Sequence, residues 1–143
     1  LAGGIAPVDR KLDGHSIEAL VRGDPEAKTP YDVFYFYFAE QLQAVRSGHW
    51  KLFLPLTSSG RHPHFESGRS RSPLLFHVST DIGSKEDVAD EHPHVVQRLT
   101  ALAQAARAEL GDAGRRGTGQ RPAVRIEEPT PRLKSTTLVR PLQ

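Results

Sequence analysis

PHVVQRLTALAQAARAEL, residues 93–110, predicts an amphipathic helix, and this helix decides which fold the rest of the chain can form. Pro93 suits the first turn of a helix, and Gly111 suits the position just after its end. Five apolar side chains recur at the spacing of one helical face. They are Val95, Leu99, Leu102, Ala106 and Leu110. The stripe predicts that one side of this helix packs on another layer of the protein.

That other layer is predicted by short apolar runs that precede the helix. Residues 33–39 (VFYFYFA) are all apolar, aromatic or β-branched, as expected for a core strand buried on both faces or paired in the middle of a sheet. Residues 42–47 and 49–56 flank a Ser47-Gly48 turn signal and predict a hairpin, and residues 74–78 predict another strand. The fold class is therefore α+β, with a small antiparallel sheet of three to four strands packed against the C-terminal amphipathic helix.

Within the hairpin, alternation assigns side chains to two faces of the sheet. Trp50, Leu52 and Leu54 are expected on the inward face, with Lys51 and Phe53 on the opposite face. We expect Trp50 and the tyrosines of residues 33–38 to pack in the core rather than to stack on a ligand. Since such a sheet leaves one face uncovered, that face is suited to docking on a larger domain.

The chain is expected to divide into three parts. Residues 1–32 form a leading segment with a short helix across 16–21, residues 33–111 form the sheet and helix, and residues 112–143 form an irregular basic tail. Ser16 is a candidate cap for the short helix, and its apolar side chains would dock on a neighbour. A solvated tail is favoured over an anion-binding one. Its arginines are Arg115, Arg116, Arg121, Arg125 and Arg132.

Residues 57–73 (TSSGRHPHFESGRSRSP) predict a long exposed loop, of a length that usually accompanies a function. Arg61, His62 and His64 are its candidate site residues, as part of the rim of a substrate pocket. Plain solvated histidines are the alternative. Metal binding is disfavoured because zinc sites need three or four ligands and only two histidines occur here.

Composition excludes several classes of function. The net charge of +2, from 19 basic and 17 acidic residues, does not indicate a nucleic-acid-binding protein. With no cysteine, the chain has no disulfide, no thiolate metal site and no cysteine nucleophile. The acidic residues between 79 and 92 lack the spacing of a calcium loop and suit the N-terminal end of the following helix instead.

No apolar run approaches the length of a membrane span, and no signal-peptide pattern opens the chain. Because the chain also contains no methionine, it is expected to be either a processed product or a piece of a longer protein, and we favour a piece.

Three stretches together resemble the C-terminal region of bacterial arylsulfatase-type enzymes, the formylglycine-dependent sulfatases. They are RKLDGH (residues 10–15, with the short helix that follows), QLQAVRSGHWKL (41–52) and TDIGSKEDVADEHPHVVQRLT (80–100). Their order and spacing also match, and the resemblance covers roughly residues 6–122.

This resemblance implies a small sheet and helix packed beside a larger N-terminal catalytic sulfatase domain that acts on a sulfate ester. In the family, a cysteine or serine in a C-x-P-S-R type motif becomes formylglycine, and a divalent cation, usually calcium, binds the sulfate group. This chain contains neither the C-x-P-S-R type motif nor the motifs that bind the cation in the family. We therefore expect no catalytic residue and no metal ligand in it, and no hydrolysis by it alone. The resemblance also implies a periplasmic or secreted protein.

One departure from the family pattern lies next to the long loop. Similar enzymes commonly carry W-K-L-H-F-P-H-T, whereas Phe53 and Leu56 stand here in place of the two histidines. Either substrate contacts differ in this member, or His62 and His64 supply polar groups a few residues later. A second class of function also stays open, namely a free-standing module that binds a protein or a sulfated glycan through an exposed sheet face.

Overall fold

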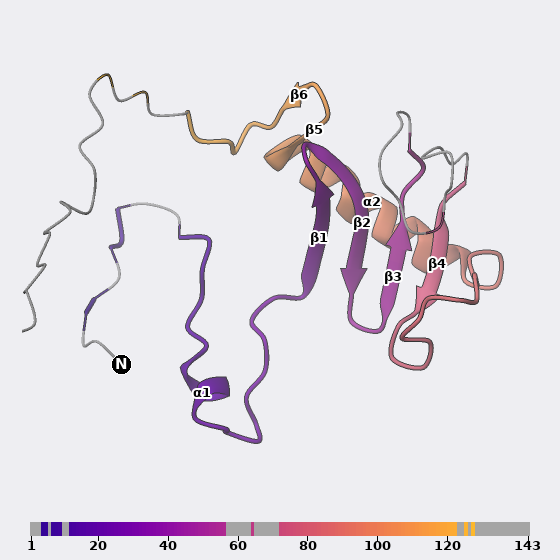
Figure 1. Cartoon of the computed structure of the whole chain (residues 1–143), viewed down its shortest axis with the longest axis horizontal. Coiled ribbons are helices and arrows are strands. Elements are labelled where there is room, and N and C mark those ends of the chain that lie inside the picture. The colour runs from indigo at the N-terminus through magenta and orange to yellow at the C-terminus, as the bar shows by residue number, and fades with distance from the viewer. Residues whose placement is uncertain are drawn as a thin grey trace, which may run out of the picture.

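The computed structural model describes residues 4–5, 7–9, 12–56, 64, 72–122, 125 and 127. Its elements follow the chain in a simple order, with two helices and six strands in these residues (Figure 1). They are α1 (Glu18–Val21), β1 (Val33–Phe38), β2 (Gln41–Ser47), β3 (Trp50–Phe53), β4 (Leu74–His77), α2 (Pro93–Leu110), β5 (Gly111–Asp112) and β6 (Arg115–Arg116).

Strands β1 to β4 form one antiparallel sheet in the order of the chain. The predicted turn between β2 and β3 is present, with Gly48 at φ 58°, a conformation that glycine adopts without a steric penalty. A bulge lies between β1 and β2, because Phe36 pairs with Ala44 whereas Tyr37 pairs with Leu42. Gln43 is the extra residue, and it places both Leu42 and Val45 on the same face of the sheet.

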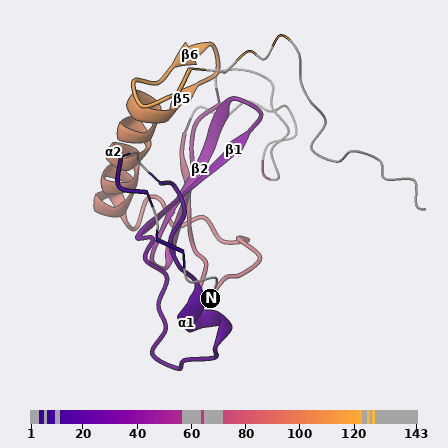
Figure 2. The same cartoon turned by 90° about the vertical axis from the view of Figure 1, so that its left-hand side faces the viewer.

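Helix α2 lies across one face of the sheet and packs on β2 and β3 (Figure 2). We call this the helix-covered face. Its core contains fully buried leucines from three parts of the sheet and one from the helix, with Tyr35, Tyr37 and Trp50 packed around them. These leucines are Leu42, Leu52, Leu54, Leu75 and Leu99. The predicted α+β fold is thus confirmed, as is the core position of the tyrosines and the tryptophan.

The predicted stripe of α2 needs one correction. Val95, Leu99 and Ala106 are buried as predicted. Ala103, which the predicted stripe omitted, is fully buried, whereas Leu110, which it included, is exposed. The small side chain of Ala103 permits close approach of the helix to the sheet, whereas Leu110 lies in the last turn, where the chain begins to fold back as β5 and β6.

The opposite face of the sheet carries a row of aromatic and cationic side chains. We call it the outer face, and its members come from all four strands. They are Phe34, Phe36, Phe38, Ala44, Arg46, Lys51, Phe53 and Phe76. Ala44, Phe53 and Phe76 form a second, smaller buried cluster, and the β1 phenylalanines remain exposed.

The expectation that residues 33–39 form a strand buried on both faces or in the middle of the sheet is wrong. β1 lies at the edge, and its side chains alternate between half-buried and exposed. Three of them, Phe34, Phe36 and Phe38, expose 44%, 41% and 50% of their surface. Composition alone could not distinguish a core strand from an edge strand that presents aromatic side chains on its outer face.

The chain on either side of the sheet also differs from expectation. Helix α1 lies apart from the sheet in both views (Figures 1 and 2), and its cap is Ile17, which makes no side-chain capping bond. Ser16 instead accepts a hydrogen bond from the backbone of Glu18. Beyond Gly111, where an irregular tail was expected, the chain forms β5 and β6. The division into three parts at residues 32 and 111 remains a prediction.

Candidate functional site

His64 is the one predicted site residue that the structure describes, since Arg61 and His62 lie outside the described residues. Its ring stacks on Phe76, with ring centres 4.9 Å apart, and meets the edge of Phe53 at 4.8 Å. His64 is half-buried by these contacts. His64 therefore lies at the outer face of the sheet rather than at the helix-covered face.

The two positions where similar enzymes carry histidine are apolar and buried. Phe53 belongs to the outer-face cluster and Leu56 follows the end of β3, and each exposes 5% or less of its surface. His64 lies directly against Phe53, so a histidine is present beside the first of these positions. Whether substrate contacts differ in this member or the loop histidines supply the polar groups stays a prediction.

The acidic segment between β4 and α2 supports the local backbone. Asp81 accepts hydrogen bonds from the N–H groups of Lys85 and Glu86, and Asp87 accepts them from Leu75 and Ala89. Three of these N–H groups belong to the loop itself, as is common for turn-forming side chains, and that of Leu75 belongs to β4. Throughout the part of the chain that the structure describes, no group of three His, Cys, Asp or Glu side chains is placed to hold a metal.

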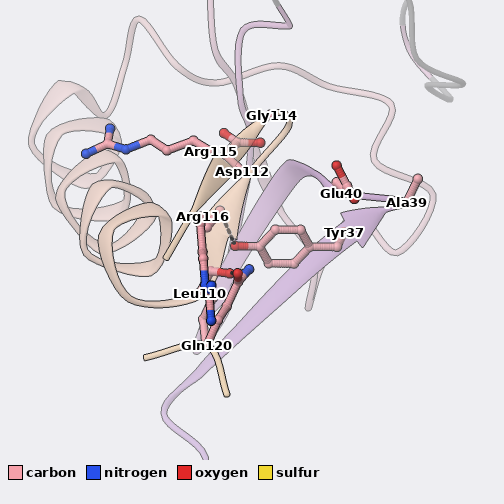
Figure 3. Close-up of a pocket in the computed structure, with 10 residues that line it drawn as sticks. Tyr37, Ala39, Glu40, Leu110, Asp112, Gly114, Arg115, Arg116 and Gln120 are labelled. Carbon is pink, nitrogen blue, oxygen red and sulfur yellow. Dashed lines mark hydrogen bonds between the residues drawn. The ribbon is translucent and has the colours of Figure 1, made fainter. Parts of the chain in front are cut away.

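A cleft of about 580 Å³ lies where the C-terminal end of α2 meets β1 and the hairpin of β5 and β6 (Figure 3). The phenol of Tyr37 points into it and donates a hydrogen bond of 2.9 Å to the carbonyl of Gly111. Glu40, Arg115 and Arg116 lie around the rim. The cleft thus combines an aromatic wall with charges of both signs.

Asp112 is the centre of the polar contacts beside this cleft. Its carboxylate accepts hydrogen bonds from the N–H groups of Leu42 and Ala113 and is paired with Arg107 at 2.5 Å. Burial by itself would raise the pKa of Asp112, but these hydrogen bonds and the charge of Arg107 outweigh it, so the pKa lies below its ordinary value. Burial and the nearby Asp112 carboxylate raise the pKa of Tyr37.

The end of α2 is closed by a glycine-containing turn that the sequence analysis missed. Thr118 and Gly119 donate backbone hydrogen bonds to the carbonyls of Ala108 and Glu109, which the helix itself leaves without a partner. A Cβ on Gly117 would lie 2.2 Å from the carbonyl oxygen of Glu109. In the sequence, Gly117 and Gly119 follow the helix stop at Gly111 and could have indicated this turn. Their contacts, however, depend on how the hairpin of β5 and β6 folds back.

The polar contacts of Tyr37 and Asp112 join α2, the sheet and the hairpin of β5 and β6. The carboxylate of Asp112 and the hydroxyl of Tyr37 are already engaged with backbone or arginine partners, so they do not form a nucleophile with a neighbouring base. Of the tail arginines, Arg121 pairs with Asp13 of the leading segment at 2.5 Å, both groups being exposed. Arg115 and Arg116 are exposed in β6, Arg125 is exposed, and Arg132 lies outside the described residues.

Comparison with known proteins connects this architecture to one family. The family model described as the C-terminal region of aryl-sulfatase matches residues 29–120, which include the whole sheet, α2 and the closing turn. The chain belongs to this sulfatase C-terminal region family. The four-stranded sheet, α2 and the turn that closes α2 are thus the part of this protein that the family model describes.

Two relatives agree with this assignment. Steryl-sulfatase of Mus musculus is 31% identical over 135 residues, which cover 79% of this chain and 22% of that protein. A solved sulfatase structure from work on glycosaminoglycan metabolism in Bacteroides thetaiotaomicron has a TM-score of 0.55 and 25% identity, covering 72% of this chain. The chain spans 22% of the length of each relative. No helix in the described ranges is both long and apolar enough to cross a lipid bilayer.

Proposed function

We propose that this sulfatase C-terminal region is the non-catalytic part of an enzyme that hydrolyses sulfate esters, and that it completes the fold of a preceding catalytic domain. The observation that carries the proposal is that the family match coincides with the sheet and α2, which form one packed unit. The outer face of that unit lacks a covering layer among the described residues, as expected of a part made to pack against another.

In this proposal, the formylglycine and the divalent cation, calcium in most of the family, belong to the catalytic domain. The chain has no cysteine to convert and no C-x-P-S-R or S-x-P-S-R sequence. Formylglycine supplies a nucleophile for sulfate transfer, and the cation stabilises the negative charge of the sulfate group. The residues of this chain supply neither group, and they support that chemistry by holding the catalytic domain and its pocket in shape.

We further propose that the loop at residues 57–73 forms part of the rim of the substrate pocket, with Arg61, His62 and His64 facing the sulfate ester. His64 supports this assignment, because its ring is held between Phe53 and Phe76 on the outer face. A half-buried imidazole with a fixed ring plane is positioned to orient a ligand more precisely than a solvated one.

The first experiment reads the coding sequence upstream of Leu1. A C-x-P-S-R or S-x-P-S-R motif in the same frame is expected. An initiator codon directly before this segment, after an in-frame stop, would instead support a free-standing interaction module. The full-length protein should then hydrolyse 4-nitrophenyl sulfate, and the 143-residue chain alone should not.

The loop is tested in that full-length enzyme with His62→Ala, His64→Ala and Arg61→Ala. A raised KM or a lowered kcat is expected if these side chains contact substrate. His94→Ala is the matched control, because His94 is an exposed histidine in the first turn of α2. Kinetics equal to those of the control would assign the loop to the solvated surface.

The location of the enzyme follows the family, and we propose that it is periplasmic or secreted. Fractionation of the cells that make the full-length protein tests this directly. Sulfatase activity in the periplasm or the medium is the expected result, and activity confined to the cytosol would contradict it.

A further inference from the structure

Lys51 occupies an unusual position on the outer face. Its ammonium nitrogen lies 4.5 Å from the ring centre of Phe36 on β1 and 4.6 Å from that of Phe53 on its own strand. Ala44 pairs with both phenylalanines across the sheet, and its short side chain leaves a gap between the rings. The lysine is therefore held between two aromatic faces, an arrangement that favours a cation.

A second cation lies directly opposite. Arg46 of β2 pairs with Lys51 of β3 in the sheet register, and its guanidinium donates a hydrogen bond to the carbonyl of Gly48. Burial and then the charge of Arg46 lower the pKa of Lys51. Like charges in directly opposite positions destabilise a sheet. Among the described residues, no carboxylate forms an ion pair with either of these cations.

The surroundings of this cation pair are apolar. Phe34, Phe36 and Phe38 are exposed on an edge strand, and the tilted ring contact of Tyr31 with Phe34, at 5.8 Å, continues the aromatic surface toward the leading segment. Exposed apolar edge strands promote association with other chains unless something covers them. An exposed apolar patch with a positive centre is complementary to an apolar partner surface that carries one negative group.

We propose that the outer face is the surface on which the catalytic domain of the same enzyme docks, and that a carboxylate of that domain binds between Lys51 and Arg46. This inference rests on the proposed function and specifies its contact. The relatives extend far beyond the matched segment, since it covers only 22% of each, so they contain a large further part to cover this face. A free sulfate would neutralise the cations but would leave the phenylalanines exposed.

Coverage of the face is measured by cysteine labelling, which is clean because the chain has no cysteine of its own. Phe36→Cys and Phe34→Cys are each made in the 143-residue chain and in the full-length protein, and maleimide labelling of that peptide is followed by mass spectrometry. Labelling about tenfold slower or more in the full-length protein is expected, because a reagent reaches a covered thiol only when the contact opens. Ile82→Cys, at a highly exposed apolar residue outside the sheet, is the control and should label equally in both.

Equal labelling of Phe36→Cys and Phe34→Cys in both proteins would overturn the inference. If that full-length protein still hydrolyses a sulfate ester, the proposed function survives and only the docking face is wrong. Absence of the formylglycine motif upstream would instead remove the proposed function itself.

The carboxylate is tested by charge reversal at Lys51. Lys51→Glu places a carboxylate opposite Arg46, so the melting temperature of the chain alone is expected to stay level or rise. In the full-length protein the same change sets two carboxylates against each other, and the melting temperature is expected to fall. Lys85→Glu, at an exposed lysine of the connection before α2, is the control for a change in net charge. A change of the same sign in both proteins would overturn the carboxylate contact.

A free anion is separated from a protein carboxylate with inorganic sulfate as the probe. No specific stabilisation of the chain alone by sulfate is expected beyond that of the Lys51→Met variant. Stabilisation that is present in the unmodified chain and absent from Lys51→Met would show that the cation pair takes a free anion, and would overturn the contact with the catalytic domain.

Discussion

The helix-covered face and the outer face are built from the same four strands but are completed in different ways. On the first, α2 covers Val45, Leu52 and Leu75 so that none of their surface is exposed. On the second, the buried cluster contains Ala44, Phe53 and Phe76, and the β1 phenylalanines keep 41% or more of their surface exposed. The comparison teaches that a strand's composition does not show which layer covers it. Aliphatic side chains meet a layer within the chain, whereas the exposed aromatic side chains are proposed to meet one outside it.

The largest effect is expected at the centre of the helix-covered face. Leu52→Ala should lower the free energy of unfolding of the chain by about 3 to 4 kcal/mol, because it removes a fully buried side chain and leaves a cavity. Urea denaturation followed by circular dichroism measures this. A loss equal to that of an exposed position would mean that α2 does not cover the sheet in solution.

The next effect concerns the turn that closes α2. Gly117→Ala should cost about 3 kcal/mol, at the upper end for overpacking, because all three atoms its Cβ would meet within 2.4 Å are backbone atoms. Gly14→Ala is the matched control, since nothing lies within 4 Å of a Cβ there. Thermal unfolding of both variants measures this, and Gly117→Ala should have the lower melting temperature. Equal melting temperatures would contradict the packing of Gly117 in the turn that closes α2.

A smaller effect is expected at Asp112, at the edge of the helix-covered face. Asp112→Asn should cost about 2 kcal/mol near neutral pH, because it weakens charge-assisted hydrogen bonds from Arg107 and Leu42. The pKa of Asp112 is lowered in the fold, so its contribution is present above the ordinary value of 3.8 and is lost as pH falls from there through the lowered pKa.

Melting temperatures at pH 6 and pH 3 check the sign of this effect. The unmodified chain should lose more stability between these two pH values than Asp112→Asn does. Asp90→Asn, at an exposed carboxylate for which the described residues provide no hydrogen bond, is the control. A pH dependence unchanged by Asp112→Asn would show that the Asp112 carboxylate does not contribute to it.

The smallest effect on the chain alone is expected on the outer face. Phe36→Ala should change the free energy of unfolding by only about 1 kcal/mol, because 41% of its surface is already exposed and the change removes mainly the contact of the ring with Lys51. The same variant should raise solubility, measured by light scattering, since it removes part of an exposed apolar patch. A loss as large as that of Leu52→Ala would abolish the distinction between the two faces.

Much of the fold follows from local sequence patterns. The period of residues 93–110, with Pro93 and Gly111 at its ends, predicted α2 at about its observed bounds, and the Ser47-Gly48 signal placed the hairpin. Local signals succeeded there because turn chemistry and helical period act over a few residues. For the candidate site, the sequence indicated the loop at 57–73, and the structure brings one of its residues, His64, against Phe53 and Phe76.

Other features depended on contacts between segments far apart in the chain. The order of the strands made β1 an edge, although its composition resembles that of a core strand. The bond from Leu42 to Asp112 and the packing of Gly117 on Glu109 join segments that no short-range pattern relates. The position of the Lys51 ammonium group likewise depends on Phe36 and Phe53, which come from two strands with Ala44 between them.

By itself the sequence determined the α+β class, helix α2, the β2–β3 hairpin and the resemblance to the sulfatase family, because each is written in a contiguous pattern. Only the tertiary structure decided which face of each strand is covered, where His64 lies and which cations find no carboxylate among the described residues. The physical reason is that burial and electrostatic pairing depend on which strands become neighbours, and sheet order and register set those neighbours.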